Sequence, residues 1–191
     1  MEKSNGKKIN TAVFISGRGS NLYSLIKYSK KKNCPIIIRL VISSNLKAKG
    51  LIYAKRYKIK THIINFKNHN ISEKKLLKKL LYNNINLICL AGFMKILSKK
   101  FIKEFTKPIL NIHPSLLPKF KGLNTHKRVL ENKEKYTGAT VHLVSEKLDS
   151  GKIILKKKVK ISKYDNDKTL EKKVLKTEHA LYPQAIKKFL I

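Results

Sequence analysis

The chain has little of what marks a secreted, metal-binding or membrane-spanning protein. It contains no tryptophan and only two cysteines, Cys34 and Cys89, which lie too far apart in the sequence to form a close ligand pair. Cys89 sits inside an apolar run, so we expect both to be small core residues. No apolar stretch approaches the roughly 18 residues that cross a bilayer, and the N-terminus lacks the apolar segment of a signal peptide. These absences predict a cytoplasmic protein that uses no disulfide, metal or membrane.

Acidic residues are also scarce, since 11 Asp and Glu face 44 Lys and Arg, which gives a formal net charge of +33. This charge predicts salt-sensitive attraction to polyanions, and a lysine-rich nucleic-acid-binding protein is one alternative. Arg is best suited to bidentate recognition of bases and phosphates, yet it occupies only positions 18, 39, 56 and 128. Because the lysines are scattered among Asn and Ile, we interpret them as compositional drift and expect no specific nucleic acid partner.

Apolar, β-branched runs alternate with longer Lys-rich segments of helical period along the whole chain. This alternation predicts an α/β fold with a single doubly wound, mostly parallel sheet whose N-terminal half is Rossmann-like. The expected strands are residues 11–16, 35–43, 61–66, 86–91, 109–113, 138–145 and 152–161. The expected helices are residues 20–31, 46–57, 72–83 with Ser72 as the cap, one after Gly92, 125–132 and 169–189. Because no low-complexity linker interrupts the pattern, residues 1–191 are expected to form one domain.

The first expected strand and helix are joined by a glycine-containing turn, Ser16-Gly-Arg-Gly-Ser-Asn21. Glycines let the backbone approach a ligand, and the N-terminus of the following helix favours a phosphate. The third glycine of the dinucleotide fingerprint is missing, so the turn predicts a phosphomonoester site rather than an NAD site. A plain tight turn with a helix cap explains the same residues equally well.

Two further segments carry ionisable or amide side chains. In Asn111-Ile-His-Pro-Ser-Leu-Leu-Pro118 the alternation of strand side chains puts Asn111 and His113 on the same side, at the carboxyl end of a strand. Asp149 lies on the turn Leu148-Asp-Ser-Gly151, and a carboxylate near His113 would raise the pKa of the imidazole. Alone, the first pattern also fits a structural hydrogen-bonding pair and the second an ordinary turn.

Five segments in this order closely resemble the phosphoribosylglycinamide formyltransferase family, and the match runs from Thr11 to the C-terminus. They are Gly17-Arg-Gly-Ser-Asn21, Leu90-Ala-Gly-Phe-Met-Lys-Ile-Leu97, Asn111-Ile-His-Pro-Ser-Leu-Leu-Pro118, Gly138-Ala-Thr-Val-His142 and Leu148-Asp-Ser-Gly151. The resemblance implies the formyltransferase fold. It also implies transfer of a formyl group from 10-formyltetrahydrofolate to the amine of glycinamide ribonucleotide in purine synthesis, without a metal.

The resemblance implies that Asn111, His113 and Asp149 are catalytic. Asn111 and protonated His113 would stabilise the negative charge that develops on the formyl oxygen. Asp149 would keep His113 charged and, through a water, help move the proton from the attacking amine to the folate nitrogen.

The implied binding residues form two sets. The substrate set is Gly19, Ser20, Asn21, Leu175, Lys176, Thr177 and Glu178. The folate set is His69, Met94, Lys95, Ile96, Leu97, Asn111, Ser145, Glu146, Lys147, Leu148 and Asp149. His69 stands near the position where the family commonly has an Arg. Without the resemblance, Glu178 reads as a solvated helix-face residue and the apolar residues at 94–97 read as core.

Two related activities are alternatives, although neither suits the length of this chain. A formyltetrahydrofolate hydrolase normally carries a regulatory domain before its similar catalytic segment, and only ten residues precede the first expected strand here. Formylation of methionyl-tRNA would require a C-terminal RNA-binding domain. The transferase is therefore expected, as a monomer or homodimer.

Overall fold

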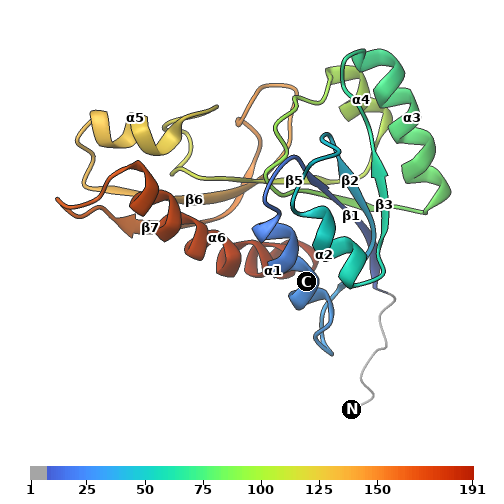
Figure 1. The fold of residues 1–191 in the computed structure, drawn as a ribbon, viewed down its shortest axis with the longest axis horizontal. Helices are drawn as coiled ribbons and strands as arrows, with labels where there is room; N and C mark the ends of the chain where they lie inside the picture. Colours follow the sequence, from blue (N-terminus) through green and yellow to red (C-terminus); the bar gives the residue numbers. More distant parts are fainter. Residues whose placement is uncertain (1–7) are drawn as a thin grey trace. The chain divides into compact units, whose positions relative to one another are not determined.

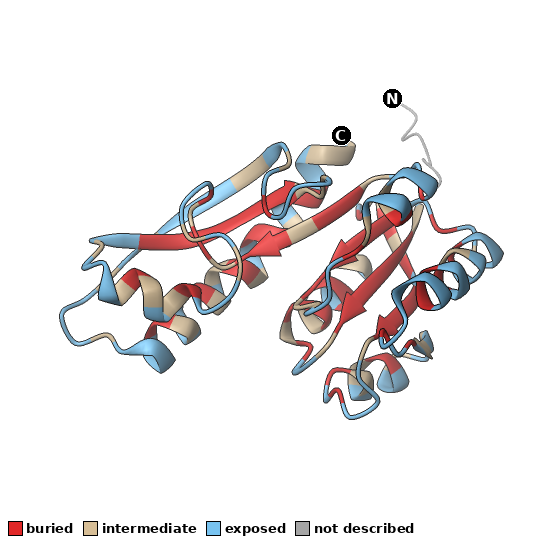
Figure 2. Cartoon of the chain, turned by 90° about the horizontal axis from the view of Figure 1, so that it is seen from above, coloured by how far each residue is buried: buried red, intermediate tan, exposed pale blue. Residues whose placement is uncertain are grey.

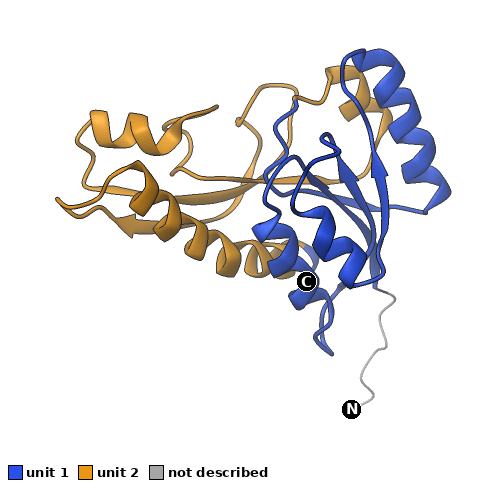
Figure 3. Cartoon of the chain, viewed as in Figure 1, with its two compact units in different colours: residues 1–95, 190–191 blue, residues 96–189 orange. Residues whose placement is uncertain are grey.

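The computed structural model describes residues 8–191, which form two compact units (Figure 3). Unit 1 contains the described residues up to 95 together with 190–191, and unit 2 contains residues 96–189. Each unit has its own strands and helices (Figure 1).

Unit 1 is built on four parallel strands in the order β3-β2-β1-β4. Their bounds are Ile9–Ile15 for β1, Ile36–Ser43 for β2, Lys60–Ile63 for β3 and Leu87–Leu90 for β4. Apart from the first two residues of β1 and two positions of β2, strands β1, β2 and β4 are buried along their length, as Figure 2 shows in red. Near-continuous burial is typical of parallel strands that helices cover on both faces.

Three helices cover this sheet: α1 (Ser20–Ser29), α2 (Leu51–Arg56) and α3 (His69–Tyr82). In Figure 1, α1 and α2 lie on one side of the strands and α3 on the other. This is the arrangement that right-handed crossovers produce when the chain moves outward from β1 and then returns to β4.

Unit 2 contains three antiparallel strands in the order β5-β6-β7, with bounds Ile109–His113, Tyr136–Leu143 and Ile153–Lys160. Its helices are α4 (Lys99–Glu104), α5 (Thr125–Glu131) and α6 (Asp167–Leu190). The hydroxyl of the buried Tyr182 donates to the carbonyl oxygen of Leu110 at 3.0 Å, so a polar bond as well as apolar packing fixes α6 to β5.

All seven strands and all six helices of the described residues correspond to predicted elements, and three boundaries differ from the prediction by at least three residues. The helix expected over 46–57 begins only at Leu51, because the Asn45 side chain accepts from the backbone N–H of Lys47 and forms a local turn. Helix α3 starts three residues before Ser72 and is capped by Asn68, whose Oδ1 accepts from the N–H of Ile71. The third strand was expected to reach residue 66 and ends at Ile63. Cys34 and Cys89 are both buried, as predicted.

Candidate active site

In unit 1, the carboxyl ends of three neighbouring strands are joined by the hydroxyl of Ser16. Ser16 Oγ lies 2.6 Å from Ser44 Oγ, and it accepts from the backbone N–H of Met94 at 2.8 Å. The turn after β1 and the segment after β4 are therefore held side by side. Open α/β sheets bind their ligands at this edge.

The turn after β1 depends on a contact between two glycine backbones. Gly19 has φ +75°, and a Cβ at this position would collide with the Cα of Gly50. The N–H of Gly50 donates to the carbonyl oxygen of Gly17 at 3.0 Å, which holds the two segments together. Helix α1 begins at the next residue, Ser20, so the predicted phosphate ligands occupy the end of the turn and the first positions of a ten-residue helix. The positive end of a helix suits an anion.

His69, predicted to contact folate, belongs to a row of aromatic rings in unit 1. Its ring meets that of Phe66 edge-on at 5.7 Å, and Phe66 meets Phe93 at 5.5 Å. Phe93 directly precedes the exposed Met94 and Lys95. The three predicted folate contacts of unit 1 thus lie around one aromatic row.

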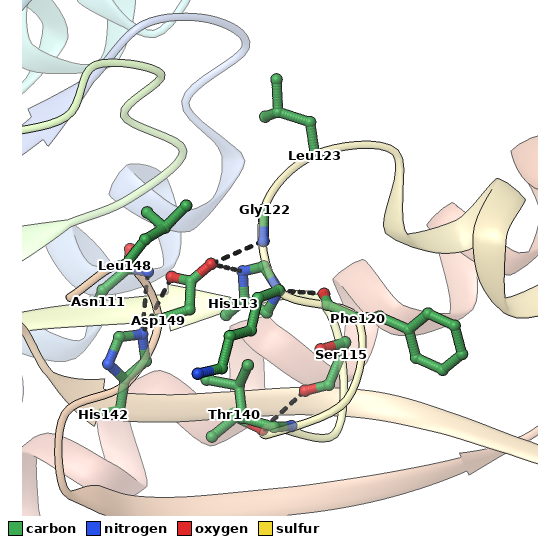
Figure 4. A network of polar contacts seen from close by, with 12 residues as sticks. Asn111, His113, Ser115, Phe120, Gly122, Leu123, Thr140, His142, Leu148 and Asp149 are labelled. Atoms are coloured by element: carbon green, nitrogen blue, oxygen red, sulfur yellow. Dashed lines mark hydrogen bonds and ion pairs between the residues drawn. The ribbon is translucent and has the colours of Figure 1, made fainter.

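In unit 2, His113 and Asp149 form a buried pair (Figure 4). His113 ends β5, and its Nδ1 lies 3.4 Å from Oδ2 of Asp149, on the turn between β6 and β7. On the other side of the ring, Nε2 donates to the carbonyl oxygen of Phe120 at 2.8 Å. The imidazole is therefore fixed in its plane by one acceptor at each nitrogen.

His142 joins Asn111 to the same network and was not among the predicted site residues. Its Nδ1 donates to the Leu143 carbonyl oxygen at 2.8 Å, and its Nε2 lies 3.2 Å from Asn111 Nδ2. His142 Nε2 also lies 3.6 Å from Oδ1 of Asp149. The residue lay within a motif used to recognise the family, but only the register of β5 on β6, which pairs Asn111 with His142, indicates its role.

Asp149 is held ionised by its contacts. Burial alone raises the pKa of its carboxyl group, but His142, the backbone N–H of Gly122 at 2.9 Å and His113 together lower the pKa below the ordinary value of 3.8. Asp149 has φ +46°, a left-handed conformation that costs a non-glycine residue energy. The fold maintains this backbone conformation and directs the carboxylate at two imidazoles.

The pKa of His113 differs from the sequence expectation. Burial lowers the pKa of the imidazole, the Phe120 carbonyl and Asp149 raise it, and His142 and Arg128 lower it, so that the pKa lies below 6.5 overall. The prediction that a nearby carboxylate raises the pKa is right for its own contribution, but desolvation outweighs it. At neutral pH the free protein therefore holds His113 mainly neutral, although both of its nitrogens face acceptors that suit the protonated form.

A buried hydroxyl supports the segment that follows His113. Thr140 Oγ1 donates to the carbonyl oxygen of Ser115 at 2.7 Å and accepts from the N–H of Leu117 at 3.1 Å. Ser115 Oγ in turn donates to the carbonyl oxygen of Lys119 at 2.6 Å. Residues 115–119, which include the cis Leu117–Pro118 bond, are thus bonded to β6 and to themselves.

The predicted folate residues of unit 2 are Ile96 and Leu97, Asn111 on β5, and the 145–149 turn. Glu146 contacts Lys103 at 3.4 Å and Lys99 at 4.0 Å, which ties the 145–149 turn to α4. Ser145 Oγ donates to the Lys147 carbonyl oxygen at 3.0 Å and stabilises the same turn. Among these residues Ile96 and Leu148 have exposed apolar side chains, whereas Leu97 is buried.

Glu178 is buried on α6, with 6% of its surface exposed. The interpretation of Glu178 as a solvated helix-face residue is therefore wrong. Its neighbours Leu175 and Thr177 are half-buried and Lys176 is exposed. The predicted substrate residues divide between the units, with Gly19, Ser20 and Asn21 in unit 1 and the α6 residues in unit 2.

Residues 8–191 contain neither a candidate metal cluster nor a membrane-spanning helix. No cluster of three His, Cys, Asp or Glu side chains in this range could hold a metal ion. None of the helices described is both long and apolar enough to cross a membrane.

Comparisons with known proteins agree over almost the whole chain. Residues 9–186 match the formyl transferase family. The chain is 42% identical over 94% of its length to the human trifunctional purine biosynthetic protein adenosine-3, of which it spans 18%. It is 41% identical to the phosphoribosylglycinamide formyltransferase of Haemophilus influenzae, covering 96% of this chain and 87% of that one.

A solved structure extends the likeness to three dimensions. The phosphoribosylglycinamide formyltransferase of Brucella melitensis superposes with a TM-score of 0.91 at 41% identity, over 96% of both chains. This confirms the expected fold class, a mixed, mostly parallel α/β sheet with a Rossmann-like N-terminal half. With sequence and fold in agreement, the chain belongs to the formyl transferase family.

Proposed function

We propose that this protein transfers the formyl group of 10-formyltetrahydrofolate to the amine of glycinamide ribonucleotide. The observation that carries the proposal is the buried network of Asn111, His113, His142 and Asp149 in a chain of the formyl transferase family. Relatives that this chain matches at 38 to 41% identity over most of both lengths are named phosphoribosylglycinamide formyltransferase.

The chemistry needs a donor for the charge that forms on the formyl oxygen. As the amine nitrogen attacks the formyl carbon, the carbonyl π electrons move to oxygen. Asn111 Nδ2 has two hydrogens and only one neighbour, His142 Nε2, at hydrogen-bond distance among the described residues, so at least one hydrogen is available to that oxygen. His113 Nδ1, which faces Asp149 Oδ2 at 3.4 Å, supplies a second donor after it takes a proton from solvent, and it returns that proton when the intermediate collapses; Nε2 is already committed to Phe120.

Asp149 performs the proton transfer in this proposal. Its lowered pKa keeps it ionised at neutral pH, so it can accept the amine proton through a water and return it to the folate nitrogen. The new carbon–nitrogen bond to the amine forms and the bond to the folate nitrogen breaks. As oxyanion charge develops, Nδ1 protonation becomes more favourable, which offsets the burial that lowers the pKa of free His113.

The binding roles are those that the resemblance to the family implies. We assign the substrate phosphate to Gly19, Ser20 and Asn21, and the ribose or glycinamide end to residues 175–178, with Glu178 as the anchor. We assign the folate to residues 94–97, to the 145–149 turn and to His69. A cytoplasmic location and a monomeric or homodimeric state belong to the same proposal.

The test is an assay of folate turnover by the purified protein, with and without glycinamide ribonucleotide. We expect turnover only when the amine is present, and we expect His113→Ala to remove most of it while the protein stays folded. His62→Ala, an imidazole on β3, is the matched control and should keep wild-type activity. Turnover without the amine would indicate a hydrolase, and equal activity in His113→Ala would reject the mechanism.

A further inference from the structure

Arg128 is one of only four arginines in this lysine-rich chain, and it binds backbone atoms near His113. From α5, its guanidinium Nη1 donates to the carbonyl oxygen of Lys121 at 2.6 Å and lies 3.4 Å from that of Leu123. Its Cζ also lies over the ring of Phe120, 5.6 Å from the centroid. One side chain therefore contacts residues 120, 121 and 123.

The same short segment holds both members of the ionisable pair. The carbonyl oxygen of Phe120 accepts from His113 Nε2 at 2.8 Å, and the N–H of Gly122 donates to Asp149 Oδ2 at 2.9 Å. Figure 4 shows these two bonds leaving the 120–122 segment toward the pair. Any displacement of this segment changes the orientation of the imidazole and the environment of the carboxylate together.

We infer that Arg128 is a positioning residue, which clamps residues 120–123 so that Phe120 and Gly122 hold His113 and Asp149 in the geometry for catalysis. The inference rests on the proposed function for its effect on rate, but the clamp itself is a property of the fold. Arg128 acts on the pair through the backbone of this segment and, at longer range, through its charge.

The clamp explains why arginine stands at this position. Phe120 has φ +56° and Asn124 has φ +54°, so the segment contains non-glycine residues in the left-handed region that need support from elsewhere. A planar guanidinium can donate to carbonyl groups and stack on a ring in one fixed arrangement, whereas a lysine ammonium has no plane that could stack on the ring. Lys127, the adjacent residue on α5, instead pairs with Glu131 at the surface.

The charge of Arg128 provides a second, separable effect. The groups that face His113 are Asp149 and His142 at the β6 end and Arg128 and His126 on α5. Arg128 is one of the charges that lower the pKa of His113. A lysine at this position keeps the charge and loses the planar guanidinium, and an alanine loses both. The two variants therefore distinguish the effect of the clamp from the effect of the charge.

The experiment compares Arg128→Lys, Arg128→Ala and the control Lys127→Ala in the full chain. We expect hydrogen exchange of the Gly122 amide to become faster in both Arg128 variants, and kcat to fall roughly tenfold to a hundredfold, with KM for both substrates nearly unchanged. The His113 pKa, followed by NMR, should rise in Arg128→Ala more than in Arg128→Lys. Lys127→Ala should match wild type in all three measurements.

Two results would overturn the inference. Unchanged hydrogen exchange of the Gly122 amide in Arg128→Lys would show that residues 120–123 are held without the guanidinium. Faster exchange with an unchanged or higher kcat would show that the clamped geometry is not the productive one. Because exchange and the His113 titration need no turnover, the clamp can be judged even if the wild-type protein fails to transfer a formyl group.

Discussion

Two buried threonines on β6 should respond in opposite directions to the same substitution. Thr140 and Thr137 are both almost completely inaccessible to solvent. Thr140 Oγ1 serves the Ser115 carbonyl oxygen and the Leu117 N–H, whereas Thr137 Oγ1 is buried without a hydrogen-bond partner. Valine has nearly the same shape as threonine, so the Thr→Val change removes the hydroxyl with little change in packing.

The magnitudes follow from the groups that each change leaves behind. Thr140→Val leaves a buried carbonyl and a buried N–H unpaired, at about 1 to 2 kcal/mol each, so we expect the free energy of unfolding to fall by about 2 to 4 kcal/mol. Thr137→Val removes a buried hydroxyl that has no hydrogen-bond partner, so we expect the free energy of unfolding to rise by about 1 to 2 kcal/mol.

Equilibrium unfolding in urea measures both changes, provided that the slope with denaturant stays the same. Each variant is compared with wild type and with Thr61→Val, a change at an exposed position of β3. Equal effects at the two buried sites would refute the reasoning, because sequence context on β6 would then outweigh the hydrogen bonds. A neutral Thr140→Val would mean that residues 115 and 117 find other partners.

Three further predictions concern charge and packing. Asp149→Asn should lower kcat strongly and move the alkaline limb of the pH–rate profile to lower pH, because it removes the charge that raises the His113 pKa and the imidazole then loses its donor proton at lower pH; an unchanged profile would exclude that role. Tyr182→Phe should reduce the free energy of unfolding by about 1 to 2 kcal/mol, since the carbonyl of Leu110 loses its donor, and a smaller loss in urea unfolding would count against that bond. The free energy of unfolding should decrease as pH falls below 6.5, because four histidines have pKa values lowered by burial and the unfolded chain therefore binds more protons; constant stability between pH 7 and 5 would contradict this. These histidines are His62, His113, His126 and His179.

The fold could be predicted largely from patterns that depend on burial. The apolar run that became β4 could only be an inner strand, and the alternation that placed Asn111 and His113 on one side of β5 holds in the structure. The errors arose where short polar side chains bond to the backbone. The Asn45 side chain forms a turn where a helix was expected, and the Asn68 side chain caps a helix where a loop was expected. Hydrophobic periodicity carries no information on such local hydrogen bonds.

The candidate site was predictable by residue type but not by environment. The carboxylate of Asp149 does lie beside His113, as the sequence suggested, and the assigned roles remain predictions. His142 was missed because its part depends on strand register, and the low pKa of His113 was missed because desolvation depends on how many atoms surround the ring. The strand register and the number of atoms around a side chain are both properties of the folded chain that the sequence does not state.

Because the backbones of Gly19 and Gly50 are in contact, the residues tolerated at these two distant positions depend on each other. A side chain added at either position meets the main chain of the other, which has no rotamer to change, so no second substitution within the pair can restore the fit. In a library that randomises both positions, tolerated sequences should keep glycine at both, and single survivors should be rarer at 19, where the positive φ adds strain, than at 50. A segment far from the 17–21 turn in sequence thus limits how that turn can evolve.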